Sequence, residues 1–298
     1  MARIGWSTGY HECYWGRWPF EGKQMGGSER IVVYTAIAQA KAGHEVTVRL
    51  PWDCEEKVWE GVRWIGKDHA AQRYDCLFCA DDFDKSDGAD RCALVACRSD
   101  APRHTDFDAL IFLSQTHADF CGHSGSPVVG GGVSLADYAT PLPRLPQRVI
   151  CTSSPDRCPR AAVIGRSFDF RHAYKPVQGF TSTEYDRADL IALQLSAQVM
   201  AYPLEPTRPS DFFSMAVLEA MAAGTPVVVS DADSMRELWN DAALVLPNPL
   251  RLSTWHAAVA ELLRDRNLWQ HYSDLGRAKA ATYTWEKQSQ RYLAALGA

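Results

Sequence analysis

A helix that stops at a glycine and leads into an apolar strand occurs once in each half of the chain. In the first half, residues 28–42 carry apolar side chains at helical spacing, end at Gly43 and continue into the alternating strand 44–50. In the second half, a helix over 211–223 stops at Gly224 and precedes a strand over 225–230. An apolar strand also comes before each helix. Strand, helix and strand in this order form a βαβ unit, so we predict an α/β protein with mostly parallel sheets.

Three prolines in the segment ATPLPRLP, residues 139–146, predict a stiff connection between two domains. After it, strands and helices are predicted to alternate, with strands at 148–154, 161–165, 176–180, 198–203, 225–230 and 243–247, and helices at 184–197, 211–223, 251–264 and 266–281. We therefore expect a first domain over 1–145, a second over 146–283 and a C-terminal helix over 284–298. A chain of 298 residues is long enough for two small domains.

The composition excludes several classes of protein. With 46% hydrophobic and 22% charged residues the chain is globular, and its net charge of −5 gives no polycation to hold a nucleic acid. Nine scattered cysteines, an odd number, favour a reducing compartment, so a cytoplasmic location is expected. The start MARIGWSTGY has no signal-peptide pattern, and the most apolar window, 213–230, is broken by a glutamate and by Gly-Thr-Pro. No transmembrane segment is expected.

The stretch from Tyr202 to Asp231 is the most informative part of the chain. A strand ends there, a proline-rich loop follows, and a helix begins near Ser214, a residue type that caps helix N-termini. The first backbone N–H groups of this helix, on Met215, Ala216 and Val217, would form an anion site of the kind that holds phosphates.

Two carboxylates flank this predicted phosphate position. Asp211 lies just before the helix, where it could simply favour the helix N-terminus, and Glu219 lies inside it. Glu219 stands among apolar neighbours, where a charge without a partner is costly. A ribose diol, with two hydroxyl donors, is a suitable partner for it.

The run from Asp211 to Ser230 resembles the donor-site motif of family 4 glycosyltransferases, enzymes with the two-domain GT-B fold. Their pattern is Glu, seven residues, Glu, and then Ala-Met-Ala-x-Gly-Thr-Pro-Val-Val. The second acid corresponds to Glu219, and the residues after it match nearly one for one through Val228. The first acid is Asp211, one methylene shorter than the family's glutamate.

Further matches to this family lie in the same order along the chain. Each resembles a known segment of it: the glycine loop Gly26-Gly27-Ser28-Glu29, the strand GHEVTV at 43–48, Gly132-Val133-Ser134-Leu135 before the second domain, the turn Ser153-Ser154-Pro155-Asp156-Arg157, and Tyr283-Thr284-Trp285-Glu286 at the start of the last helix. Gly131 and Ser134 depart from the family's usual Asn-Gly-Val-Asp. The resemblance implies two Rossmann-like domains, reduced in size, facing across a cleft, with a C-terminal helix that crosses back to the N-terminal domain.

The resemblance also assigns roles to individual residues. Glu219 would bind the ribose hydroxyls, Asp211 the hydroxyls of the donor sugar, and Arg157 the diphosphate of the leaving group. Gly27 would let the backbone approach the same phosphates. The full set of predicted donor and phosphate contacts is Gly26, Gly27, Ser153, Ser154, Ser214, Met215 and Ala216.

Weaker candidates lie elsewhere. Sugar or acceptor contacts are proposed for Asp100 and His117, and for Tyr10 and Trp15 in an aromatic loop that also holds Tyr14, Trp18 and Phe20. The acids Asp81, Asp82, Asp231 and Asp233 look like metal ligands but also like ordinary turn residues, and Cys76 and Cys79 have no second pair at zinc spacing. No metal and no cofactor is expected.

One departure from the family concerns the second domain. Only Cys158-Pro159-Arg160 separates the Ser-Ser-Pro-Asp-Arg turn from the predicted strand 161–165, and a parallel crossover needs a dozen or more residues. Either the usual crossover helix is missing and these strands are differently connected, or 161–165 is not a neighbouring strand. A domain reduced this far could rely on a partner surface, such as a homo-oligomer.

The resemblance predicts a retaining, metal-independent glycosyltransferase that uses a nucleotide-diphosphate sugar as co-substrate. The acceptor could be a glycan, a lipid carrier, a small molecule or a modified nucleic-acid base. A sugar-nucleotide epimerase of the same fold and a catalytically silent nucleotide-sugar binding module are the alternatives. A dinucleotide oxidoreductase is disfavoured because no G-x-G-x-x-G follows either leading strand.

Overall fold

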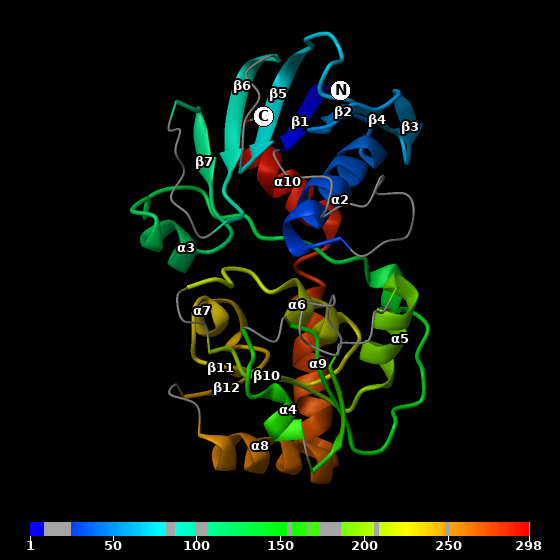
Figure 1. The fold of residues 1–298 in the computed structure, drawn as a ribbon, viewed down its shortest axis with the longest axis vertical. Coiled ribbons are helices and arrows are strands. Elements are labelled where there is room, and N and C mark those ends of the chain that lie inside the picture. The colour runs from blue at the N-terminus through cyan, green and yellow to red at the C-terminus, as the bar shows by residue number, and fades with distance from the viewer. Residues whose placement is uncertain are drawn as a thin grey trace. The chain divides into compact units, whose positions relative to one another are not determined.

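The computed structural model divides the chain into two compact units, each described here by itself (Figure 1). Unit 1 consists of residues 1–132 and 285–298, and unit 2 of residues 133–284. The structure describes residues 1–8, 25–81, 87–98, 106–153, 157–165, 167–172, 186–205, 209–247 and 251–297.

Unit 1 is built on a seven-stranded sheet in the order β3-β4-β2-β1-β5-β6-β7. Its elements are β1 (Arg3–Thr8), α2 (Gly27–Lys41), β2 (Glu45–Arg49), β3 (Lys57–Trp59), β4 (Val62–Ile65), β5 (Arg73–Ala80), β6 (Gly88–Val95), β7 (Ala109–Ile111), α3 (Gln115–Phe120) and α10 (Trp285–Ala295). All neighbouring strands are parallel except the β3–β4 pair. The predicted βαβ unit is confirmed as β1, α2 and β2, and Gly43 after the helix has a φ of +91°, a conformation that favours glycine.

The last helix of the chain, α10, completes the core of unit 1. Its Tyr292 is fully buried, lies edge-on to Trp6 and Phe78, and donates a hydrogen bond to the carbonyl of Val129 at 3.1 Å. Trp285, the first residue of α10, packs so closely on Gly132 that a Cβ there would lie 2.8 Å from the indole. The helix therefore packs onto the N-terminal sheet and α2, as the resemblance predicts.

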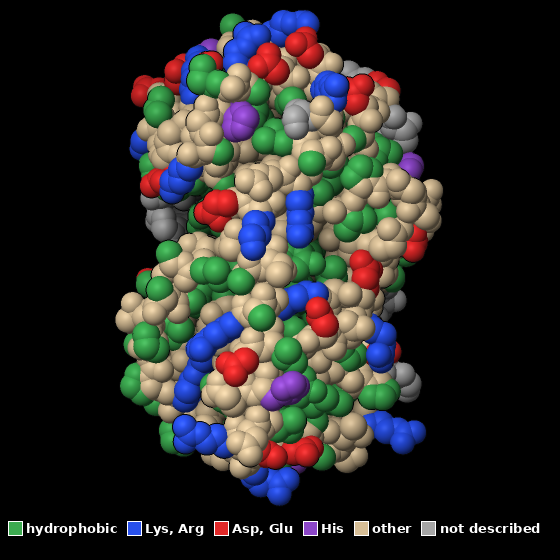
Figure 2. Space-filling view, turned by 180° about the vertical axis from the view of Figure 1, so that it is seen from behind, with side chains coloured by type: hydrophobic (Ala, Val, Ile, Leu, Met, Phe, Trp, Pro, Cys, Tyr) green, Lys and Arg blue, Asp and Glu red, His purple; other side chains and the backbone are tan. Residues whose placement is uncertain are grey.

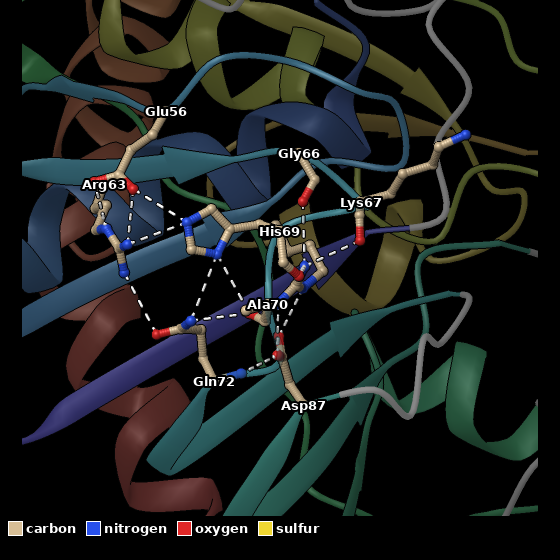
Figure 3. A network of polar contacts seen from close by, with 9 residues as sticks. Glu56, Arg63, Gly66, Lys67, His69, Ala70, Gln72 and Asp87 are labelled. Atoms are coloured by element: carbon tan, nitrogen blue, oxygen red, sulfur yellow. Dashed lines mark hydrogen bonds and ion pairs between the residues drawn. The ribbon is translucent and has the colours of Figure 1, made fainter.

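A buried ion pair fixes the loop between β4 and β5 of unit 1. Arg49, at the end of β2, holds Asp87 through Nε and Nη2 at 2.8 and 2.7 Å, and both side chains are at most 2% exposed. The same guanidinium donates to the carbonyls of Gly66, Lys67, His69 and Ala70. Figure 3 shows the loop folded around these contacts, with Glu56, Arg63, His69 and Gln72 forming an outer polar layer. These hydrogen bonds offset the desolvation of the pair.

Unit 2 carries a five-stranded parallel sheet in the order β12-β11-β10-β8-β9. Its elements are η1 (Leu135–Tyr138), β8 (Arg148–Cys151), α4 (Ala161–Gly165), β9 (Asp169–His172), α5 (Arg187–Ser196), β10 (Val199–Tyr202), α6 (Met215–Ala222), β11 (Val227–Ser230), α7 (Met235–Trp239), β12 (Leu244–Leu246), α8 (Leu252–Arg264) and α9 (Arg266–Ala280). Buried side chains of α8 at helical spacing, Trp255, Ala258, Val259 and Leu262, pack with Ile164 of α4 onto the strands. Unit 2 thus has the parallel α/β architecture that the sequence predicts.

The predicted strand 161–165 is wrong, because these residues form the helix α4. The partner of β8 is β9, which is parallel to it with Val149 opposite Phe170. Residues 152–168 connect the two strands, a length that meets the requirement of a parallel crossover. The crossover helix is therefore present but short, and the second of the two alternatives drawn from the sequence is correct. The predicted strand 176–180 lies outside the described residues.

The proline-rich segment 139–146 belongs to unit 2, and the unit boundary lies earlier, between Gly132 and Val133. Arg144 anchors the segment by donating to the carbonyls of Gln194, Ala197 and Ala223 at 3.1, 2.8 and 2.6 Å. The N–H of Leu145 also donates to the Ser196 carbonyl. The segment contains no helix or strand, and these bonds make it part of unit 2 instead of a free linker.

Candidate functional site

The loop between β10 and α6 of unit 2 ends in a capped helix. Ser214 is the N-cap of α6, and its hydroxyl accepts a hydrogen bond from the N–H of Val217 at 3.4 Å. The predicted cap is thus confirmed, but it takes up one of the three N–H groups that the sequence assigned to an anion. The N–H groups of Met215 and Ala216 remain at the end of the helix where its dipole is positive.

Asp211 is held just before this helix by two hydrogen bonds. Its side chain is 5% exposed, the Tyr202 hydroxyl at the end of β10 donates to its Oδ2, and its own N–H donates to Oδ2 of Asp233 at 2.9 Å. Burial raises the pKa of Asp211, while the positive charge of Arg157 and the hydrogen bonds from Tyr202 and Ser214 oppose that rise. Asp211 is therefore a rigidly placed carboxylate.

Arg157 lies beside Asp211, with Nη1 3.8 Å from Oδ2. It follows β8 in sequence, and its side chain is 38% exposed, so water reaches one side of the guanidinium. The structure thus brings together a cation, a buried carboxylate and the N-terminus of α6, as the motifs predict. Such an arrangement can bind an anion and a hydroxyl-bearing group side by side.

Glu219 lies within α6 and is 2% exposed. Arg187, the first residue of α5, donates from Nη1 to Oε1 at 2.6 Å, and Gln194 donates from Nε2 to Oε2 at 3.4 Å. The carboxylate therefore has a cationic partner within the protein, in addition to any ligand. Sequence reasoning missed Arg187, because the pair spans 32 positions along the chain and no motif marks it.

A ring of hydrogen bonds fixes Arg187 in turn. Its Nη2 donates to Oδ2 of Asp137 at 3.1 Å, and Tyr138 from the same turn η1 donates to Oε1 of Gln194 at 2.8 Å. Arg187 also lies over the Tyr138 ring at 6.0 Å. Glu219 is thus oriented by residues of η1 and α5 as well as by its own helix.

The other predicted phosphate contacts are placed as follows. Gly26 and Gly27 form the N-terminus of α2 in unit 1, where a Cβ on Gly26 would lie 2.3 Å from the Glu29 carboxylate. Ser153 lies after β8 in unit 2 and is 3% exposed. Ser154, Asp100, Tyr10 and Trp15 lie outside the described residues, as do Tyr14, Trp18 and Phe20.

His117 is not a loop residue, as the sequence suggested, but part of α3 and fully buried. Its Nδ1 accepts a hydrogen bond from the N–H of Leu113 at 3.5 Å, and its Nε2 donates to the Arg98 carbonyl at 2.8 Å. Burial lowers the pKa of the imidazole. The side chain is packed into unit 1, because the N-cap Ser114 starts the helix that carries it inward.

Two of the acids that resembled metal ligands bind backbone N–H groups. Oδ1 of Asp81 accepts from Cys97 and Arg98, and Oδ2 of Asp233 accepts from Ser210 and Asp211. Asp231 forms an ion pair with Arg236 at 2.7 Å, and Asp82 lies outside the described residues. Among the residues that the structure describes, no three His, Cys, Asp or Glu side chains are grouped to hold a metal ion.

The surface carries mixed charges on the face shown in Figure 2. Basic, acidic and apolar side chains are interspersed there without a broad field of one sign.

Of the helices in the described ranges, none combines the length and the apolar character needed to cross a bilayer.

Comparisons with known proteins cover part of the chain that holds this site. The family "Glycosyl transferases group 1" matches residues 174–279, which include Arg187, Asp211 and Glu219. A GDP-mannose-dependent alpha-(1-6)-phosphatidylinositol dimannoside mannosyltransferase of Mycobacterium tuberculosis is 29% identical over 119 residues, 40% of this chain and 29% of that protein. The O-antigen chain mannosyltransferase B of Escherichia coli is 32% identical over 98 residues, 33% of this chain and 24% of that protein. The matched segment thus spans less than a third of either relative.

Among solved structures, AviGT4, a glycosyltransferase involved in avilamycin A biosynthesis, superposes with a TM-score of 0.73. It is 15% identical in sequence, and the match covers 99% of this chain and 97% of that one. This likeness establishes the fold over the whole chain, two Rossmann-like units of the GT-B type, and the segment of the family match lies in unit 2. In sequence, the similarity to the glycosyl transferases of group 1 is confined to residues 174–279.

Proposed function

We propose that this protein transfers a sugar from a nucleotide-diphosphate sugar to an acceptor hydroxyl, with retention of configuration at the anomeric carbon. The observation that carries the proposal is the placement of Arg157, Asp211 and Glu219 around α6. The positive N-terminus of α6 lies beside the Arg157 guanidinium and the Asp211 carboxylate. The second buried carboxylate, Glu219, lies one and a half turns into the same helix.

The diphosphate would lie at the N-terminus of α6. There the guanidinium of Arg157 and the N–H groups of Met215 and Ala216 would meet the negative charge that builds up as the nucleotide leaves. Asp211 would accept hydrogen bonds from hydroxyls of the donor sugar. Its contacts with Tyr202 and Asp233 hold it in place before the ligand arrives, so little ordering is needed on binding.

Glu219 would accept the ribose hydroxyls of the nucleotide. Its Oε2 has the weaker contact in the structure, a 3.4 Å hydrogen bond from Gln194, and Oε1 has the 2.6 Å bond from Arg187. We infer that a ribose hydroxyl takes the place of the Gln194 contact, while Arg187 keeps its contact with Oε1.

Two relatives that match this segment are mannosyltransferases, and one of them is named as dependent on GDP-mannose. GDP-mannose is therefore the first donor to test. The acceptor is proposed only as a hydroxyl compound, a glycan, a lipid-linked or small-molecule acceptor, or a modified nucleic-acid base. We propose a cytoplasmic location and transfer without a metal or cofactor.

The test is release of nucleoside diphosphate from a panel of nucleotide sugars, with and without acceptor mixtures. Wild-type protein should bind GDP-mannose or another member of the panel and release the diphosphate, and Glu219→Gln should lose this release. Glu261→Gln, a change of the same type at an exposed position of α8, is the matched control and should release diphosphate as wild type does.

Three outcomes would contradict the proposal. If no nucleotide sugar binds, unit 2 has no donor site. If Glu219→Gln is fully active, Glu219 does not take part in donor binding. Conversion of the bound sugar nucleotide to its epimer without dependence on an acceptor would favour an epimerase.

A further inference from the structure

A cavity of unit 2 lies at the C-terminal end of α6, where Ala223 caps the helix. It has a volume of about 340 Å³ and is bounded by the segment 138–144 on one side and by α9 on the other. Figure 1 shows α9 running beside α6, and the two helices pack against each other. The lining residues are Tyr138, Ala139, Pro141, Leu142, Arg144, Leu195, Ala223, Trp269, Gln270, Ser273 and Arg277. The volume is in the range of small-molecule sites.

Arg144 is one of two arginines in this cavity, and it is fixed in place. Its Nη1 donates to Oγ1 of Thr225 at 2.6 Å as well as to two backbone carbonyls, and its Nη2 donates to the Ala223 carbonyl at 2.6 Å. Burial, together with the positive charge of Arg277, lowers the pKa of Arg144 to about 10. The cavity therefore holds a guanidinium that is desolvated and repelled by its neighbour.

Arg277 is the second arginine, and its guanidinium lies over Gly224. A Cβ on Gly224 would lie 2.2 Å from Nε of Arg277, so the glycine leaves the space that this side chain occupies. Within the described parts of the chain, the Arg277 guanidinium forms no hydrogen bond or ion pair, and no aspartate or glutamate lines the cavity. The two positive charges are thus close together without a carboxylate between them.

The remaining walls are flat or apolar and well anchored. Trp269 lies under the Arg144 guanidinium at 5.4 Å from the ring centre, and its indole N–H donates to the Gln198 carbonyl at 2.6 Å. Ser273 donates to the Gly224 carbonyl at 2.7 Å, which fixes the floor below Arg277. Pro141 and Leu142 supply apolar surface opposite.

From this geometry we infer that the cavity binds a phosphate monoester whose organic part is flat or apolar. The guanidinium of Arg277 can pair with two phosphate oxygens at once, and Arg144 adds its charge and the N–H groups on Nε and Nη2 that its own contacts leave over. The anion would relieve the repulsion between Arg144 and Arg277, and the organic part would pack on Trp269 and Pro141. This inference does not depend on the proposed transferase activity, because it uses neither Arg157 nor Glu219.

Calorimetric titration with phenyl phosphate and with inorganic phosphate tests the inference. We expect wild-type protein to bind phenyl phosphate with a Kd of about 1 mM or tighter, and inorganic phosphate more weakly. Arg277→Ala should weaken the binding of phenyl phosphate at least tenfold, and Arg277→Lys should weaken it less. Arg266→Ala, at an exposed position of the same helix, should leave it unchanged.

The melting temperature of each variant is measured as a control for loss of fold. Arg277→Ala should leave it unchanged, because Arg277 is exposed and makes no bond that the fold requires. Vesicles containing phosphatidic acid present the same monoester on a lipid. If these vesicles co-sediment with wild-type protein but not with Arg277→Ala, the inferred phosphate site is supported and its ligand is a lipid. No binding of any phosphate by wild type, or binding that Arg157→Ala removes and Arg277→Ala does not, would overturn the inference.

Discussion

Removal of Arg187 should destabilise unit 2, because it leaves Glu219 buried without its cationic partner. The cost of breaking a fully buried ion pair is about 3–5 kcal/mol. Arg187 is 27% exposed while Glu219 is 2% exposed, so water screens one end of the pair and the cost should be lower. We expect Arg187→Met to lower the free energy of unfolding by about 1–3 kcal/mol.

A double-mutant cycle with Glu219→Gln isolates the pair itself. The glutamine keeps a carbonyl that can accept from Arg187 but carries no charge, so Arg187→Met should cost less in its presence. The coupling between the two changes should be about 1–2 kcal/mol, measured by urea unfolding with unchanged m-values. Arg236→Met is the matched control, because it removes an ion pair of similar length, to Asp231 at 2.7 Å, on the exposed surface of the same unit. It should have no measurable effect.

The same variants give a functional reading of the pair. Under the proposed function, Arg187→Met should weaken nucleotide-diphosphate binding, because Glu219 then loses the 2.6 Å hydrogen bond that orients its carboxylate. The reasoning about Glu219 is refuted if Arg187→Met is as mild as Arg236→Met, or if the coupling energy vanishes.

Three further predictions concern other parts of the site. Burial raises the pKa of Asp211, so its contribution to stability is fully present below its ordinary value of 3.8 and is lost as the pH rises through the raised value. Asp211→Asn should therefore raise the melting temperature relative to wild type more at pH 7 than at pH 4, and an equal difference at both pH values would contradict this. Gly224→Ala should cost about 1–2 kcal/mol from its φ of +69°, and Gly122→Ala, with a φ of +79° and open space around it, should cost about the same, because the exposed Arg277 guanidinium can move away from the new methyl group. A much larger cost at Gly224, measured by urea unfolding, would show that Arg277 is held in place. Sugar transfer should persist in excess EDTA, since Arg157 and the N-terminus of α6 meet the diphosphate charge, and loss of activity that Mg²⁺ or Mn²⁺ restores would count against this.

The parts of the fold that sequence reasoning predicts best are those fixed by contacts close along the chain. The cap of α6 at Ser214 and its end at Gly224 are set by local hydrogen bonds and by a positive φ, and residue types report both. Residues 161–165 were predicted wrongly because a run of five small and apolar residues fits a buried strand and a short helix equally well. Only the packing of Ile164 against α8 decides between them.

The features that the sequence does not reveal depend on distant partners. Arg187 meets Glu219, and Arg144 meets the carbonyls after α5 and α6, across separations of 32 to 79 residues. In the sequence, neither Arg187 nor Arg144 differs from an ordinary surface arginine. The same reason explains the displaced unit boundary, since the prolines of 139–146 predict an extended chain but not the bonds of Arg144 that hold it to unit 2.

The chain passes between the units twice, after Gly132 and before Trp285, and this has a consequence for synthesis on the ribosome. Unit 2 is one continuous stretch, so all of its residues leave the ribosome before α10 does. All strands of the unit 1 sheet are synthesised early. Trp6 and Phe78 of this sheet are covered only when Tyr292, more than two hundred residues later in the chain, has also been synthesised. The C-terminal unit should therefore finish folding first, and the N-terminal sheet should be the part of the nascent chain that needs protection by chaperones.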